Sequence, residues 1–202
     1  MKFKKIREIQ KVRGFDPYTG IYSTYEPNRI YFHNTFVELE EEPSKIKLIG
    51  ERIFTRDPAG YLKIWEEGIL IETIENADLL SKSDNNQILK YYYDKEWNSY
   101  DNILDLETNK LILKESIPYQ LYVEKNIIIA YDIFEGEIKR INTDTETLWQ
   151  FTIASLGDSP YPDEEDRIDK IVGIANGNLW VYTNLYRLIA LDIETGSVQY
   201  HT

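Results

Sequence analysis

The sequence predicts an all-β fold, a β-propeller-like array of about four to five four-stranded antiparallel blades. Three observations lead to this prediction. A turn built on an aspartate recurs at blade-sized intervals, and the segments between the turns read as pairs of short strands. After residue 13, no stretch sustains the apolar period of a helix.

The clearest turn lies in LIALDIETGSVQY, residues 188–200 of a 202-residue chain. Here Asp192 is followed four residues later by Gly196. The carboxylate can accept hydrogen bonds from the backbone N–H groups of a hairpin turn, and glycine adopts the left-handed conformation that such turns need. Related frames, some with asparagine in place of glycine or with a shortened turn, are anchored at Asp16, Trp65, Asp105, Asn142 and Asp192.

These anchors are 49, 40, 37 and 50 residues apart. A propeller blade takes about 40–50 residues, so the intervals are of blade size. Strand pairs precede the last two anchors, at 126–141 and 177–191. We therefore expect the residues near 65, 105, 142 and 192 to occupy equivalent turns of successive blades. A generic antiparallel sandwich with unrelated turns is the alternative.

A single propeller-type domain is expected over residues 1–202, with residues 1–13 as a basic N-terminal arm. The arm has six lysines and arginines against Glu8, a net charge of +5. Because the whole chain carries −12, the remaining 189 residues carry −17. The apolar residues of the arm recur every third position, which fits one side of a short helix or a strand with a bulge.

Aromatic residues gather before the anchor at 105, where three consecutive tyrosines at 91–93 are followed by Trp97 and Tyr100. Aromatic side chains dominate protein cores, so we expect these rings to pack between blades rather than to form a ligand surface.

An acidic loop at 157–170 lengthens the last interval. Two prolines stiffen it around one tyrosine, and four consecutive carboxylates follow. A stiff loop with an aromatic anchor is a plausible binding element, although a solvated insertion is the alternative. A second acidic run, at 38–43, is expected to be a polar connection. The candidate partner-binding residues are Tyr161, Asp163, Glu164, Glu165 and Asp166.

Closing the ring is a problem for this chain. Only 10 residues follow Asp192 and 15 precede Asp16, which leaves about 26 for the last step between blades, short of the roughly 40 expected. Either the array is open or partial, or the sequence is truncated after Thr202, or a second copy closes it.

The last blade resembles the repeat of quinoprotein-type (PQQ-like) β-propellers, on the strength of Ala190, Asp192, Gly196 and an aromatic residue at position 200. That repeat usually has tryptophan where this chain has Tyr200. The resemblance is best over the final 30 residues, because the earlier anchors match by the aspartate and turn residue alone. It implies a propeller scaffold, which by itself does not set a function.

The resemblance does not carry the quinone chemistry of that family. Its alcohol-oxidising members have eight blades and a periplasmic signal, hold calcium with an aspartate base, and commonly use a vicinal disulfide. This chain has no cysteine and at most five blade-sized units, and residues 1–10, which no continuous apolar run follows, are not expected to be a secretory signal. We therefore expect no cofactor.

Other catalytic and metal-binding patterns are missing from the sequence. His33 and His201 are far apart and have no partner residues at zinc-ligand spacing. There is no glycine-rich phosphate loop and no nucleophile elbow, and the acidic stretch 158–166 lacks the ligand spacing of a calcium-binding loop. We expect neither a catalytic residue nor a metal site, and hence no enzyme.

Charge and composition favour a protein partner. A body of −17 repels nucleic acid and anionic lipid and attracts basic proteins, although acidity can also serve solubility alone. The lack of cysteine and of a signal fits the cytoplasm. In size and charge the chain resembles bacterial immunity proteins, which implies a non-catalytic inhibitor of a basic, toxin-like protein. The alternative is a small-ligand-binding or enzymatic propeller module with a site in the central channel.

Overall fold

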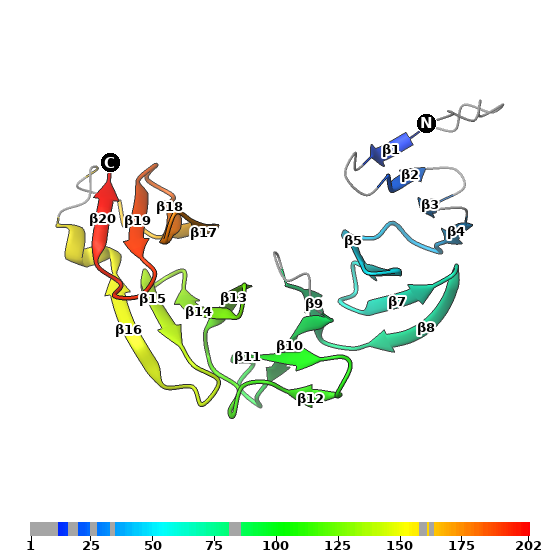
Figure 1. The fold of residues 1–202 in the computed structure, drawn as a ribbon, viewed down its shortest axis with the longest axis horizontal. Coiled ribbons are helices and arrows are strands. Elements are labelled where there is room, and N and C mark those ends of the chain that lie inside the picture. The colour runs from blue at the N-terminus through cyan, green and yellow to red at the C-terminus, as the bar shows by residue number, and fades with distance from the viewer. Residues whose placement is uncertain are drawn as a thin grey trace. The chain divides into compact units, whose positions relative to one another are not determined.

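The computed structural model describes residues 12–15, 20–24, 28–32, 35–80, 86–157, 161 and 164–202 (Figure 1). These residues form twenty strands and one short 3₁₀ helix, η1 (Ile153–Leu156). The strands make five antiparallel sheets of four, each with its strands in chain order, so the prediction of an all-β array of four-stranded blades is confirmed. Within the described ranges, no helix is long and apolar enough to cross a membrane.

The chain divides into two compact units, residues 1–79 and 80–202. The strands of the first two sheets are β1 (Val12–Phe15), β2 (Tyr22–Thr24), β3 (Arg29–Phe32) and β4 (Thr35–Glu38), then β5 (Lys45–Ile49), β6 (Arg52–Arg56), β7 (Leu62–Glu66) and β8 (Ile69–Ile74).

The other three sheets follow in the same up-and-down order. Their strands are β9 (Ala77–Leu79), β10 (Gln87–Tyr93), β11 (Ser99–Asp105) and β12 (Lys110–Leu111), then β13 (Gln120–Glu124), β14 (Ile127–Asp132), β15 (Glu137–Ile141) and β16 (Thr147–Thr152), and finally β17 (Ile168–Ala175), β18 (Asn178–Thr183), β19 (Leu188–Asp192) and β20 (Val198–His201).

The recurring anchors lie at equivalent places, as predicted. Trp65, Asp105, Asn142 and Asp192 all stand at or next to the end of the third strand of a sheet, before the turn to the fourth strand. Asp16, the first anchor, lies outside the described residues. The blade-sized spacing therefore reports a real structural repeat over the last four sheets.

The turn chemistry is also as expected. The Oδ1 atom of Asp192 accepts hydrogen bonds from the backbone N–H groups of Glu194 and Thr195 at 3.0 and 2.8 Å. Gly196 then takes a left-handed φ of 72°. These N–H donors, above all that of Thr195, stabilise the carboxylate and lower the pKa of Asp192. Asp105 makes the same bonds in its own turn, followed by Asn109 at a φ of 52°.

Trp149 joins the fourth sheet to the turn of the fifth. Its indole Nε1 donates a hydrogen bond of 2.8 Å to the carbonyl of Ile193. Its ring lies so close to Gly196 that a Cβ atom there would be 2.7 Å from the ring atoms. Glycine is therefore required at position 196 both by backbone conformation and by this contact.

Apolar side chains fill the space between consecutive sheets of each unit. In the second unit, one cluster joins the fourth and fifth sheets around Ile129, Leu179 and Ile189, all fully buried. In the first unit, Ile30 and Ile53 form part of the cluster between the first two sheets. Because strands alternate their side chains between two faces, an inner sheet buries residues on both sides.

The expected basic arm lies mostly outside the described residues, at 1–11, and its last two residues, Val12 and Arg13, belong to β1. The expectation that the aromatic cluster packs between blades is wrong for Tyr92, Tyr93 and Trp97, whose side chains are exposed; the exposed fraction of Trp97 is 81%. The reason is that the β10–β11 hairpin carries Tyr93 and Trp97 at its tip, beyond the rings of Tyr91 and Tyr100, which are partly buried.

Candidate functional site

The acidic loop borders an open hollow of about 650 Å³ in the second unit, which we call the acidic hollow. Glu164, Glu165 and Asp166 line it, together with Phe134 and Glu135 from the β14–β15 turn. The structure thus brings three of the five predicted partner-binding residues together. The loop is shorter than predicted, because residues 168–170 already belong to β17.

The other two predicted residues are placed differently. Tyr161 is 49% exposed and is not among the residues that line the acidic hollow. Its carbonyl accepts a hydrogen bond from the backbone N–H of Glu164 at 3.0 Å, so it shapes the loop. Asp163 lies outside the described residues.

Asp166 ties the loop to the sheet. Its side chain is only 6% exposed, and its Oδ2 lies 3.2 Å from Nε of Arg187, which is itself 9% exposed. The next residue reinforces this attachment, because the backbone N–H of Arg167 donates to Oδ1 of Asn184 at 2.6 Å. Asp166 therefore belongs to a buried ion pair that holds the loop, while Glu164 and Glu165 remain on the surface.

Phe134 is the residue of this site that the sequence did not single out. Its ring is 73% exposed, and the guanidinium of Arg167 lies 5.6 Å from its centroid. Phe134 stands in a second Asp–Gly frame, in which Asp132 accepts hydrogen bonds from the N–H groups of Phe134 and Glu135. That frame was a usable signal, because it predicts a tight turn whose tip residues project into solvent.

The charges around the acidic hollow do not cancel. Arg187 faces Asp166, and Arg167 pairs with Glu165 at 2.5 Å. Glu135 and Glu164 take part in no ion pair among the described residues. The hollow therefore offers two uncompensated carboxylates beside an exposed aromatic ring, an arrangement that attracts a cationic surface.

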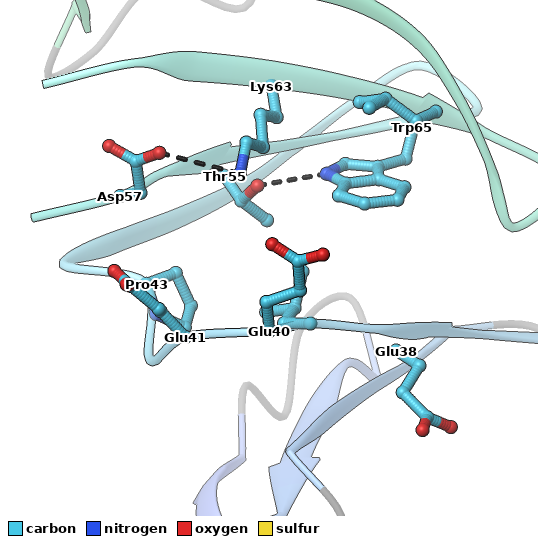
Figure 2. Close-up of a pocket in the computed structure, with 10 residues that line it drawn as sticks. Glu38, Glu40, Glu41, Pro43, Thr55, Asp57, Lys63 and Trp65 are labelled. Carbon is cyan, nitrogen blue, oxygen red and sulfur yellow. Dashed lines mark hydrogen bonds and ion pairs between the residues drawn. The ribbon is translucent and has the colours of Figure 1, made fainter. Parts of the chain in front are cut away.

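A second pocket, of about 180 Å³, lies in the first unit beside the acidic run 38–43 (Figure 2). The run, expected as a polar connection, forms one wall of it. Figure 2 shows Glu40 directed toward Thr55 and Trp65. The indole Nε1 of Trp65 donates to Oγ1 of Thr55 at 2.9 Å, and Lys63 lies 3.5 Å from Asp57.

A third pocket, of about 210 Å³, surrounds Asp101 on β11 and is called the Asp101 pocket. Asp101 is 7% exposed, and burial raises the pKa of its carboxyl to about 6. Burial and the nearby charge of Asp101 also raise the pKa of Tyr131, which lines the same pocket. Phe134 lines both this pocket and the acidic hollow.

Histidine, aspartate and glutamate side chains do not gather in groups of three or more at metal-binding distance within the described part of the chain. His33 lies outside that part, and His201 is exposed at the end of β20.

The sequence matches no protein-family model and no curated protein. Solved structures share the fold. BamB from Moraxella catarrhalis, a PQQ-like β-propeller, superposes with a TM-score of 0.54 at 12% identity, over 78% of this chain and 47% of that one. The computationally designed Ika8 protein gives a TM-score of 0.60 at 11% identity, over 96% of this chain and 62% of that one.

A third structure, KlHsv2 with loop 6CD replaced by a Gly-Ser linker, gives a TM-score of 0.60 at 12% identity. The superposition covers 95% of this chain and 66% of KlHsv2. The chain therefore spans about half to two thirds of these structures, and at such identities the likeness concerns the fold.

Proposed function

We propose that this chain is a non-catalytic, protein-binding β-propeller of the PQQ-like type whose partner is a basic protein. One observation carries the proposal, namely the uncompensated carboxylates of Glu135 and Glu164 beside the exposed ring of Phe134 in the acidic hollow. Aromatic residues and charge complementarity are what interfaces use for affinity and for rapid encounter. The charge of −17 outside residues 1–13 supports the same sign of partner.

The finer proposal is an immunity-type role in the cytoplasm, in which the chain covers a basic surface of a toxin-like protein and blocks it. Its support is the small size, the acidity and the absence of cysteine. In this proposal the acidic loop supplies charge through Glu164 and Glu165, while Phe134 supplies the aromatic anchor.

The experiment compares three forms of the purified chain as bait for proteins of the source cell. The forms are the natural chain, the double variant Glu164→Lys with Glu165→Lys, and a control with the same charge change at Glu96 and Glu115, which are exposed and do not line the acidic hollow. We expect a basic protein that the natural chain and the control retain and the loop variant loses.

Equal retention by all three forms would place the interface elsewhere, and retention of an acidic protein would contradict the charge argument. The immunity-type role has its own readout. An activity of the retained protein should stop when one equivalent of the chain is added, and persistence of that activity in the complex would exclude inhibition.

A further inference from the structure

The Asp101 pocket holds a buried negative charge without a basic partner. Asp101 takes part in no ion pair among the described residues. Within the described part of the chain, its carboxylate accepts hydrogen bonds only from the Ser99 hydroxyl, at 3.5 Å, and from the backbone N–H of Leu121. A buried carboxylate is normally balanced by a cation or by several hydrogen bonds, so this one is under-compensated.

The walls of the pocket suit a cation. Three aromatic residues, Tyr119, Tyr131 and Phe134, line it with Asp101. Electron-rich ring faces attract ammonium groups, most strongly where water is excluded. The chain already shows this at Tyr119, because Nζ of Lys139 lies 4.4 Å from the ring centroid and 2.6 Å from the hydroxyl.

Other groups do not neutralise Asp101 from inside the pocket. Lys139 lies 2.7 Å from Glu137, so its charge is matched there. Asp132 lines the pocket as a second carboxylate, and its Oδ1 caps the turn at Phe134 and Glu135. The volume of about 210 Å³ exceeds the need of a single water molecule, for which ~10–15 Å³ suffices.

From this geometry we propose that the Asp101 pocket binds a primary ammonium group, which pairs with the Asp101 carboxylate beside the rings of Tyr131 and Phe134, while Tyr119, already in contact with Lys139, forms part of the wall. The group comes either from a small alkylamine or from a lysine side chain, since both present the same head on an apolar stem. The pocket adjoins the acidic hollow, because Phe134 lines both, but its carboxylate is Asp101 rather than the Glu135 and Glu164 of the hollow.

The test measures binding of three probes to the full chain by calorimetry and by the NMR signals of the aromatic rings. The probes are butylammonium, Nα-acetyl-lysine amide and, as the neutral match, butanol. We expect both ammonium probes to bind and to shift the ring signals of Tyr131 and Phe134, and butanol to do neither. Tighter binding of butylammonium would identify a free alkylamine as the source of the ammonium group. Tighter binding of Nα-acetyl-lysine amide would identify a lysine of a peptide as the source.

The pH dependence gives an independent readout. Only the ionised carboxylate attracts the ammonium, and a pKa of about 6 leaves Asp101 roughly a tenth ionised at pH 5. Binding should therefore be about tenfold weaker at pH 5 than at pH 7.5. The titratable groups that face Asp101 are its cross-strand neighbour Tyr91, and Tyr119, Tyr131 and Asp132. Asp132 is the other carboxylate that lines the pocket, and the variant Asp132→Asn distinguishes its titration from that of Asp101.

Substitutions complete the test. Asp101→Asn keeps the shape and should weaken both ammonium probes at least tenfold at pH 7.5, while the exposed control Glu115→Gln should not change them. Phe134→Ala, at a solvent-exposed ring that the fold does not need, should weaken them several-fold and keeps the test decisive if Asp101→Asn unfolds.

The proposal fails if the natural chain binds butanol as well as it binds butylammonium, if it binds no ammonium probe, or if Asp101→Asn binds both unchanged. Its failure is distinguishable from that of the partner proposal, because the probes are used without any protein partner. Conversely, Asp101→Asn should leave retention of the basic protein unchanged.

Discussion

At the scale of single residues, Gly196 shows why this repeat uses glycine. Two constraints act there, the left-handed φ of 72° and the ring of Trp149 at 2.7 Å from where a Cβ would be. Gly177 has a similar φ of 77°, with nothing within 4 Å of the equivalent position. Comparing substitutions at these two glycines therefore distinguishes the cost of backbone strain, which both share, from the cost of a steric clash, which only Gly196 has.

We expect Gly196→Val to lower the free energy of unfolding by about 3 kcal/mol or more, and Gly177→Val by about 1–2 kcal/mol. The first variant carries both strain and a clash with Trp149, the second strain alone. Urea unfolding followed by tryptophan fluorescence measures both. Equal losses in the two variants would mean that the Trp149 contact does not constrain position 196.

Asp101 gives a second prediction at this scale. Its pKa is raised, whereas the pKa of a turn-capping aspartate such as Asp192 is lowered, so its ionisation has the opposite effect on stability. Its folded pKa of about 6 lies above the ordinary value of 3.8, so the unfolded chain releases the proton first as pH rises. The ionised group therefore lowers stability above pH 6, and the loss develops between about pH 4 and pH 6.

Asp101→Asn should accordingly raise the free energy of unfolding at pH 7.5, by an amount on the order of 1–3 kcal/mol, and leave it nearly unchanged at pH 3.5. Urea unfolding in amine-free buffer at the two pH values is the measurement. A variant that is less stable than the natural chain at pH 7.5 would show that the hydrogen bonds of the carboxylate outweigh its desolvation.

At the scale of elements, the sequence predicted the turns better than the surfaces. The Asp–Gly frame is local, so Asp105 and Asp192 could be placed in their turns from sequence alone. The frame at Asp132–Gly136 joins the second and third strands of its sheet, so the blade-sized spacing of the other anchors does not predict it. The exposure of Trp97 depends on how far a hairpin extends past its neighbours, which no local pattern encodes.

The burial of Asp101 could not be predicted for a similar reason. It results from β11 meeting the residues before β13 and the end of β14, contacts between segments distant in the sequence. In the acidic loop, the sequence alone does not distinguish the four consecutive carboxylates at 163–166 from one another. The structure separates them, because Asp166 turns inward to Arg187 while Glu164 and Glu165 face solvent.

The loop's attachment makes a prediction at the element scale. Removing one partner of a buried ion pair leaves an uncompensated charge, so Arg187→Met should lower the free energy of unfolding by about 3–5 kcal/mol. Arg167→Met removes the exposed pair with Glu165 and the contact with the exposed ring of Phe134, and should cost about 0–1 kcal/mol. Urea unfolding ranks the two variants, and a smaller loss at Arg187 than at Arg167 would contradict a structural role for the Asp166–Arg187 pair.

At the scale of the whole molecule, the acidic charge acts on encounter more than on the bound complex. A net charge of −12, with −17 outside residues 1–13, creates an attractive field for a basic protein before any contact forms. Contacts made by a desolvated ring such as Phe134 act only after docking. Association and dissociation rates should therefore respond to different residues.

Salt tests this division on the basic protein that the chain retains. Exposed charges are screened beyond roughly 8 Å at physiological ionic strength, so raising salt should slow association and change dissociation little. The double variant at Glu164 and Glu165 should also slow association more than it speeds dissociation.

Phe134→Ala should instead speed dissociation, by a factor equivalent to about 2 kcal/mol if the ring is buried in the complex. Tyr161, a candidate anchor from the sequence, does not line the acidic hollow, so Tyr161→Ala should change the dissociation rate less than Phe134→Ala. Stopped-flow mixing at several salt concentrations measures both rates, and an association rate independent of salt would remove charge steering from the account.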